Sequence, residues 1–144
     1  MKKIVNIGID VGSTTVKMVV MDRNENILYS DYRRHFSDTK KTIKDLFNEV
    51  LNKFKGYSFK VVCTGSGAIA LASYLKIPFI QEVIACKNAI KKYAPSANVA
   101  IELGGEDAKI IYFDSTIEQR MNGTCAGGTG AFLDQMAILL NTTT

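Results

Sequence analysis

The residues best suited to chemistry form a short loop between two strand-like runs near the amino terminus. An acid, a glycine, three hydroxyl side chains and a lysine follow one another there: Asp10, Gly12, Ser13, Thr14, Thr15 and Lys17. The glycine lets backbone amides approach an anion with no Cβ in the way, while the hydroxyls and the lysine add donors and positive charge. The acid could hold a hydrated Mg²⁺, which keeps its waters and takes few carboxylates. The pattern favours a polyphosphate site over a plain hairpin turn.

A second loop repeats this spacing further along the chain. In Glu102–Lys109 a glycine follows the acid after two positions and a lysine follows it after seven, as in Asp10–Lys17. Since the predicted strand order around the two loops also repeats, we infer an internal duplication. This repetition strengthens the polyphosphate interpretation of the first loop.

A glycine-rich stretch over residues 122–130 places Cys125 just before a predicted helix. Exposed amides and the positive end of a helix lower a thiol pKa and favour a thiolate that could ligate metal. One cysteine cannot complete a metal site, and neither Cys63 nor Cys86 stands at zinc or cluster spacing from it. We expect those two cysteines in the core, and His35 at the surface at a strand end.

A rival nucleotide motif follows the fourth predicted strand. Gly65, Gly67 and Ala70 satisfy the Gly-x-Gly-x-x-Ala pattern of dinucleotide-binding folds, and Glu82 lies at a tolerable distance for a ribose contact. That fingerprint usually opens its domain, whereas three strands and a helix precede it here, so a tight strand-to-helix turn is favoured. No Gly-x-x-x-x-Gly-Lys-Ser/Thr sequence occurs, which excludes a P-loop on pattern.

Hydrophobic periodicity predicts a mixed α/β chain whose elements position these loops. In the first part we expect strands at 4–9, 16–21, 27–33 and 59–63 and helices at 68–75 and 82–93. A further helix, with apolar residues from Ile43 to Phe54, is expected between the third and fourth strands. The second part repeats three strands and a helix: 99–103, 108–113, 116–121 and 132–140. We expect one domain over 1–96 and the opening β-β-β-α of a second domain over 97–144. The last helix is expected to expose an apolar patch that promotes self-association: Phe132, Met136, Leu139 and Leu140.

Composition and charge exclude several other classes of protein. A hydrophobic fraction of 47% and a charged fraction of 22% are those of a soluble globular protein. The net charge of +4 is modest and its lysines are scattered, which argues against nucleic-acid binding. No window approaches a membrane span and no signal peptide is present, so the cytoplasm is the default location. Three cysteines are an odd number and argue against a disulfide framework.

Three motifs, at 8–17, 101–109 and 122–130, together resemble the activators of 2-hydroxyacyl-CoA dehydratases. These form the CoA-substrate-specific activase branch of the acetate kinase, sugar kinase, heat-shock chaperone and actin superfamily. The resemblance implies two ribonuclease H-like (actin-like ATPase) domains, each with a mixed sheet, that close around Mg·ATP with Asp10 and Glu102 in the catalytic positions. It also implies which residues form the two phosphate motifs: Gly12, Ser13, Thr14, Thr15 and Lys17 in the first, and Gly104, Gly105 and Glu106 in the second.

The resemblance further implies that Cys125 is one of two cysteines that each subunit gives to a 4Fe–4S cluster bridging a homodimer. ATP hydrolysis would then drive a low-potential electron into a dehydratase or related reductase, with ferredoxin or flavodoxin as electron donor. The family's second cluster cysteine and adenosine motif lie beyond Thr144. We therefore expect an amino-terminal fragment with a truncated second domain, inactive alone, of a longer ATPase. Glu102 and Glu106 stand where many activators carry Asp and Gln, which leaves the partner enzyme open.

Two other functions stay open. A small-molecule kinase of amino-sugar or acetate type could use the same fold, but it would need a catalytic acid aligned with a substrate hydroxyl and would have no use for Cys125. The chain could also be a non-enzymatic nucleotide-sensing interaction module in which Cys125 is structural.

Overall fold

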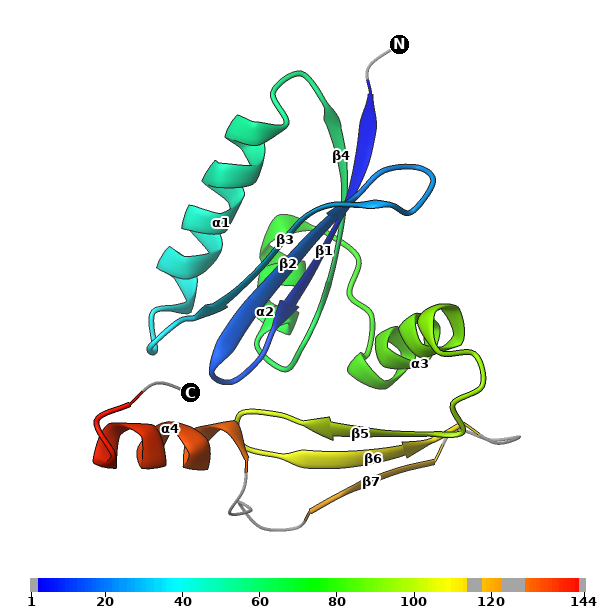
Figure 1. Cartoon of the computed structure of the whole chain (residues 1–144). Helices are drawn as coiled ribbons and strands as arrows, with labels where there is room; N and C mark the ends of the chain where they lie inside the picture. The colour runs from blue at the N-terminus through cyan, green and yellow to red at the C-terminus, as the bar shows by residue number, and fades with distance from the viewer. Residues whose placement is uncertain (1–2, 114–117, 123–128, 143–144) are drawn as a thin grey trace. The chain divides into compact units, whose positions relative to one another are not determined.

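The computed structural model describes residues 3–113, 118–122 and 129–142. The chain forms two compact units, Met1–Gln81 and Glu82–Thr144, which are treated separately below (Figure 1). The domain boundary expected between residues 96 and 97 stays a prediction. Within the described ranges no helix is long and apolar enough to cross a bilayer.

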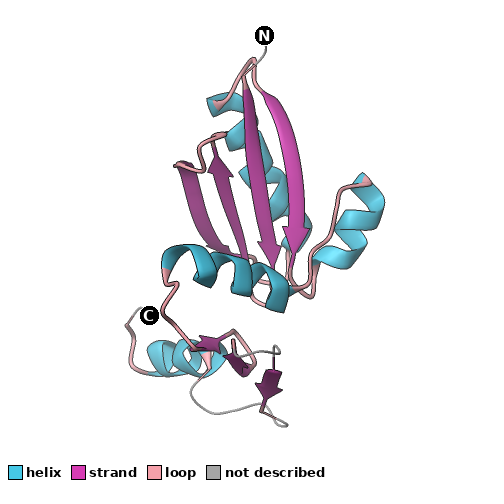
Figure 2. Ribbon diagram, turned by 90° about the vertical axis from the view of Figure 1, so that its right-hand side faces the viewer, coloured by secondary structure: helices cyan, strands magenta, loops and turns pink. Residues whose placement is uncertain are grey.

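The first unit is built on a four-stranded mixed sheet (Figure 2). Its strand order is β3-β2-β1-β4; β1 runs parallel to β4 and antiparallel to β2, and β2 runs antiparallel to β3. The predicted β-β-β-α-β-α order is confirmed, with elements at β1 Ile4–Val11, β2 Thr15–Met21, β3 Ile27–Arg34, α1 Thr39–Lys53, β4 Ser58–Thr64 and α2 Ala68–Leu75.

The core of this unit lies between one face of the sheet and the helices α1 and α2. Residues of β1 alternate between buried and partly exposed, as burial of a single sheet face requires. Helix α1 contributes residues at spacings of three and four, as its periodicity predicted. The buried side chains are Val5, Ile7, Ile9 and Val11 from β1, Val16, Met18 and Val20 from β2, Cys63 from β4, Ile43, Leu46 and Val50 from α1, and Ala68 and Ala72 from α2. The alternation places Asp10 on the sheet face opposite this core.

An ionic cluster ties β3 to α1 near the point where the chain leaves the sheet. The Arg33 guanidinium contacts the carboxylates of Asp31 at 2.5 Å and Glu49 at 2.6 Å. Hydrogen bonds from Arg33 lower the pKa of both carboxyl groups. Asp38 caps the amino end of helix α1, and its side chain accepts a hydrogen bond from the Lys41 backbone amide at 3.0 Å. The turn between Arg34 and Asp38 is thus anchored at both ends.

The second unit contains a three-stranded antiparallel sheet of order β5-β6-β7. Its elements are α3 Glu82–Tyr93, β5 Val99–Leu103, β6 Ala108–Tyr112, β7 Glu118–Met121 and α4 Gly130–Leu139, close to the predicted ranges. The expectation that Cys86 is a core residue is wrong, because α3 buries none of its residues and Cys86 is half-buried. On α4 and just after it, Phe132, Leu139 and Leu140 are exposed as predicted, whereas Met136 is half-buried.

Candidate phosphate-binding loops

The first loop is a hairpin that connects β1 to β2. Asp10 and Lys17 are paired across the two strands, and the Lys17 Nζ lies 2.9 Å from Asp10 Oδ2. The Gly12 amide donates to the Thr15 carbonyl at 2.9 Å and closes the turn. Because both charged side chains keep 35% of their surface exposed, their ion pair is screened by water and is weak.

Lys17 is held on the exposed face of the sheet by a second neighbour. Tyr32 of β3 is its register partner, and the Lys17 Nζ lies 5.5 Å from the centroid of the Tyr32 ring. Cation–π attraction of this kind restrains the ammonium group without neutralising it. The lysine is therefore positioned and still able to meet an anion. Contacts of Ser13, Thr14 and Thr15 with phosphate stay predictions.

The second loop has the same construction between β5 and β6. Glu102 is the register partner of Lys109, and the Gly104 amide donates to the Asp107 carbonyl at 2.8 Å. The closing hydrogen bonds of the two loops join the same backbone atoms at equivalent positions, which agrees with the inferred duplication. The expected roles of Gly105 and Glu106 stay predictions; the Glu106 side chain is exposed.

The second loop differs in the environment of its lysine. The Lys109 Nζ lies 2.6 Å from Glu82 Oε2 and 3.6 Å from Glu102 Oε1, with only 13% of its side chain exposed. Cys86 shares this environment: burial raises the pKa of its thiol, Glu102 raises it further and Lys109 opposes them. The Glu82 carboxylate is thus engaged with Lys109, which argues against the ribose contact considered for it in the rival dinucleotide motif.

The turn from β4 to α2 packs against the end of β1 that carries Asp10. Gly65 has φ +99°, and a Cβ there would lie 2.3 Å from the Val11 carbonyl oxygen and 2.5 Å from Asp10 Oδ1. The Gly67 amide donates to the Val11 carbonyl at 2.9 Å. The strand-to-helix turn favoured by the sequence is confirmed. Its role as a close support for Asp10 was missed, because the parallel pairing of β1 with β4 that creates it joins segments far apart in sequence.

Thr64 is a further residue that the sequence analysis missed. It ends β4 and is the register partner of Asp10, so both side chains project from the same sheet face. Its Oγ1 is excluded from solvent and has no hydrogen-bond partner among the described residues. A buried hydroxyl without a partner costs free energy, and such groups need an explanation where they occur. An unused donor and acceptor therefore lies beside the candidate Mg²⁺-binding acid.

His35 lies beneath the first loop and not at the surface. The expectation of an exposed histidine is wrong: only 8% of the residue is accessible, and its Nε2 lies 3.3 Å from the Gly12 carbonyl oxygen. Sequence statistics for histidines at strand ends did not account for the sharp turn that follows β3. Phe36 and Ser37 both have positive φ, and they reverse the chain beside the hairpin.

The amino end of α4 is joined to the second loop. The Gly130 amide donates to the Gly104 carbonyl at 3.0 Å, and the Ala131 amide donates to the Gly105 carbonyl at 2.8 Å. Cys125 lies outside the described residues, and its predicted cluster ligation stays a prediction. Within the described part of the chain, no three His, Cys, Asp or Glu residues gather as a metal site would require.

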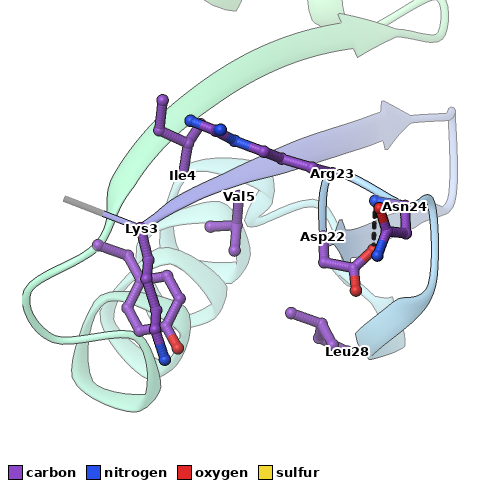
Figure 3. Close-up of a pocket in the computed structure, with 8 residues that line it drawn as sticks. Lys3, Ile4, Val5, Asp22, Arg23, Asn24 and Leu28 are labelled. Carbon is purple, nitrogen blue, oxygen red and sulfur yellow. Dashed lines mark hydrogen bonds between the residues drawn. The ribbon is translucent and has the colours of Figure 1, made fainter. Parts of the chain in front are cut away.

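A surface pocket lies at the other end of β1 from Asp10 (Figure 3). It is lined by Lys3, Ile4, Val5, Asp22, Arg23, Asn24, Leu28 and Tyr57. Most of the Asp22 carboxylate's contacts are local, because Oδ1 accepts from the Asn24 and Asn26 amides and so closes the β2–β3 turn. The pocket is about 20 Å from the phosphate loop along the strand, so the two features are separate.

Comparison with known proteins places this geometry in context. A family model described as the BadF/BadG/BcrA/BcrD ATPase family matches residues 7–144. The activator of lactoyl-CoA dehydratase from Anaerotignum propionicum is 33% identical over 143 residues, which covers 95% of this chain and 54% of that protein.

Two solved structures are similar over nearly the whole chain. The activator of the 2-hydroxyisocaproyl-CoA dehydratase from Clostridium difficile, with bound ADPNP, has a TM-score of 0.76 at 28% identity, covering 96% of this chain and 53% of that one. Component A of the (R)-2-hydroxyglutaryl-CoA dehydratase from Acidaminococcus fermentans has a TM-score of 0.79 at 27% identity, covering 97% and 55%. The predicted actin-like ATPase fold is confirmed. The chain spans about half the length of the curated relatives it matches.

Proposed function

The chain belongs to the BadF/BadG/BcrA/BcrD ATPase family, and from that premise we propose that it binds the phosphates of Mg·ATP as part of an activator of a 2-hydroxyacyl-CoA dehydratase-type enzyme. The observation that carries this proposal is the pair of hairpins with the same acid–glycine–lysine spacing, register and closing hydrogen bond. A relative solved with ADPNP and relatives named as dehydratase activators support it.

In the first loop each group has a defined task. Asp10 would hold Mg²⁺ through its water shell, and the glycine at position 12 leaves the backbone open to the phosphates. Lys17 would turn from Asp10 to a phosphate oxygen at little cost, because a half-exposed ion pair contributes about 1 kcal/mol or less. Mg²⁺ would supply charge neutralisation to the polyphosphate. Glu102 would be the corresponding acid of the second phosphate loop.

The unpartnered hydroxyl of Thr64 fits this assignment. It stands beside Asp10 on the same sheet face and lacks a partner among the described residues. Oγ1 is closed to water in the ligand-free protein, so the atoms that cover it would have to move on binding before a Mg²⁺-bound water or a phosphate oxygen could supply the hydrogen bond that the hydroxyl lacks. The cost of burying it in the ligand-free protein would then be offset by ligand binding.

Thr64→Val tests this assignment because its two expected effects differ in direction. Valine matches the shape of threonine and removes the unpaired hydroxyl, so the free energy of unfolding should stay the same or rise by up to about 1 kcal/mol. The affinity for Mg·ADPNP, measured by calorimetric titration, should fall about fivefold.

Thr42→Val is the matched control. The Thr42 hydroxyl already donates to the Asp38 carbonyl at 3.0 Å on α1. That variant should therefore lose a little stability and keep the wild-type nucleotide affinity. Equal nucleotide affinity in wild type and Thr64→Val would remove Thr64 from the proposed site.

The finer part of the proposal concerns electron transfer. We infer that Cys125 contributes to a 4Fe–4S cluster shared by a homodimer, and that ATP hydrolysis sends an electron from this cluster to the dehydratase or a related reductase. Ferredoxin or flavodoxin would supply the electron. Support comes from the join between the second phosphate loop and the amino end of α4, because Cys125 comes shortly before that helix in the sequence. Movement of the loop with nucleotide state would then displace the cluster ligand.

Iron content after anaerobic reconstitution with iron and sulfide tests this part. In the full-length protein, where each subunit supplies both cluster cysteines, we expect one 4Fe–4S cluster per dimer, and we expect Cys125→Ala to lose it. Cys86→Ala is the control, since burial raises the pKa of the Cys86 thiol and disfavours the thiolate that a cluster requires. Undiminished iron in Cys125→Ala would exclude the electron-transfer role and leave the nucleotide site standing.

A further inference from the structure

The imidazole of His35 joins the first phosphate loop to the turn that precedes α1. Its backbone amide donates to the Thr14 carbonyl at 3.1 Å, and its Nε2 lies 3.3 Å from the Gly12 carbonyl. On the other side of the ring, the Ser37 amide donates to Nδ1 at 3.2 Å. Since Nδ1 accepts a hydrogen bond, the ring proton lies on Nε2, which therefore donates to Gly12.

The backbone that holds the ring in place is strained. Phe36 has φ +44° and Ser37 has φ +67°, values that side-chain-bearing residues adopt at a cost of about 1 to 3 kcal/mol each. Phe36 also projects into solvent with 85% of its surface exposed, so hydrophobic burial of its own side chain does not explain the turn. Non-glycine residues keep such conformations only where the surroundings determine them. Here the turn brings the imidazole under the hairpin.

The contact with Gly12 sets the direction of a backbone amide. In a trans peptide unit the carbonyl of one residue and the amide of the next point in opposite directions. Because the Gly12 carbonyl is directed to His35, the amide of Ser13 is turned to the other side of the loop, and Ser13 is exposed. Amides turned outward in this way form the concave donor sets that bind phosphate.

We propose that His35 is a positioning residue that holds the Gly12–Ser13 peptide of the phosphate loop in a ligand-ready orientation. The identity of that ligand, Mg·ATP, rests on the proposed function. The orientation of the loop does not rest on it and is measurable in the ligand-free protein. His35 contacts the loop, and in this proposal it affects the nucleotide only through the loop.

Three substitutions at this position separate the contributions of the ring. His35→Gln places a side-chain amide donor where Nε2 was and keeps the contact with Gly12. His35→Asn keeps an acceptor near Nδ1 for the Ser37 amide and does not reach Gly12. His35→Phe keeps the aromatic volume and makes neither hydrogen bond. Circular dichroism and thermal melts establish that each variant is folded, and His35→Asn preserves the test if the phenylalanine variant does not fold.

Amide hydrogen exchange of Gly12, followed by ¹⁵N NMR without nucleotide, is the first measurement. That amide closes the hairpin by donating to Thr15 at 2.9 Å, so it reports loop opening. Wild type and His35→Gln should protect it equally, whereas in His35→Asn and His35→Phe it should exchange about fivefold faster, the effect of one lost hydrogen bond. Unchanged protection in the Asn and Phe variants would overturn the proposal. The proposal would also be overturned if the Gln and Phe variants lost protection of the Gly12 amide equally, because the Nε2 contact would then not be the cause of that protection.

The shift of the Ser13 amide signal on titration with Mg·ADPNP is the second measurement. Wild type and His35→Gln should show a large shift that saturates at the same nucleotide concentration. The Asn and Phe variants should need about fivefold more nucleotide to reach half of the full shift. If the exchange series follows the expected order while no variant responds to Mg·ADPNP, the positioning role of His35 stands and the proposed nucleotide function fails.

Discussion

Gly65→Ala should lower the free energy of unfolding by about 3 to 5 kcal/mol, the sum of a backbone strain term and a steric term. The residue has φ +99°, a region that alanine adopts only with strain. Its new Cβ would also lie 2.3 Å from the Val11 carbonyl oxygen, which belongs to the central strand and cannot move aside without disturbing the sheet. Urea denaturation followed by circular dichroism measures the change, provided that the slope of the unfolding transition is unaffected.

Two other glycines provide a matched series for this substitution. Gly56 has φ +85° but nothing lies within 4 Å of a Cβ there, so Gly56→Ala carries only the strain term, about 1 to 2 kcal/mol. Gly8 lies inside β1 with no positive φ and no atom within 4 Å of a Cβ, so Gly8→Ala should be neutral or stabilising. A Gly65→Ala variant no less stable than Gly56→Ala would show that the turn moves freely away from β1.

The same substitution carries a functional consequence. The added methyl group would lie 2.5 Å from Asp10 Oδ1, so a folded Gly65→Ala protein must shift either the turn or the carboxylate proposed to hold Mg²⁺, and we expect weaker binding of Mg·ADPNP. Gly56→Ala has no such contact and should bind Mg·ADPNP as wild type does. The turn between β4 and α2 therefore links the stability of the first unit to the shape of its candidate site.

Features encoded in short sequence windows were predictable. Sequence patterns located the strands and helices of the described ranges to within a few residues. In β1 and α1 the reason is that the buried face repeats with the period of the element, whereas α3 and β7 bury no residue. The acid–glycine–lysine spacing identified two similar loops between strands, and the structure adds the register that pairs Asp10 with Lys17 and Glu102 with Lys109. Local patterns therefore identified the two loops and their order along the chain.

Features created by long-range pairing were not predictable from such windows. Thr64 meets Asp10 only because β4 joins the sheet parallel to β1, and no local pattern sets that register. Gly65 was considered for a dinucleotide motif, since two glycines after a strand suit both a cofactor and a close backbone contact. His35 was misplaced because its burial depends on two residues, Phe36 and Ser37, whose left-handed conformations sequence statistics disfavour.

Asp10→Asn should weaken binding of Mg·ADPNP about 100-fold, because the carboxylate charge proposed to meet the hydrated metal is removed while the side chain keeps its size. Its ion pair with Lys17 is half-exposed, so the free energy of unfolding should change by about 1 kcal/mol or less. Isothermal titration calorimetry with and without Mg²⁺ separates the effects on metal and nucleotide. In EDTA, wild type and Asp10→Asn should bind the nucleotide equally weakly.

Asp45→Asn is the control that separates the effect of losing the charge at Asp10 from the effect of losing one negative charge anywhere on the protein. Asp45 forms an ion pair with Lys41 at 3.0 Å on the exposed side of α1, so this substitution makes the same chemical change to a similar pair. It should leave Mg²⁺-dependent affinity unaltered. If both variants weakened binding equally, the effect would come from net charge and not from a site. If Asp10→Asn lost the same factor with and without Mg²⁺, Asp10 would act on the loop through Lys17, and the metal would have to be held elsewhere.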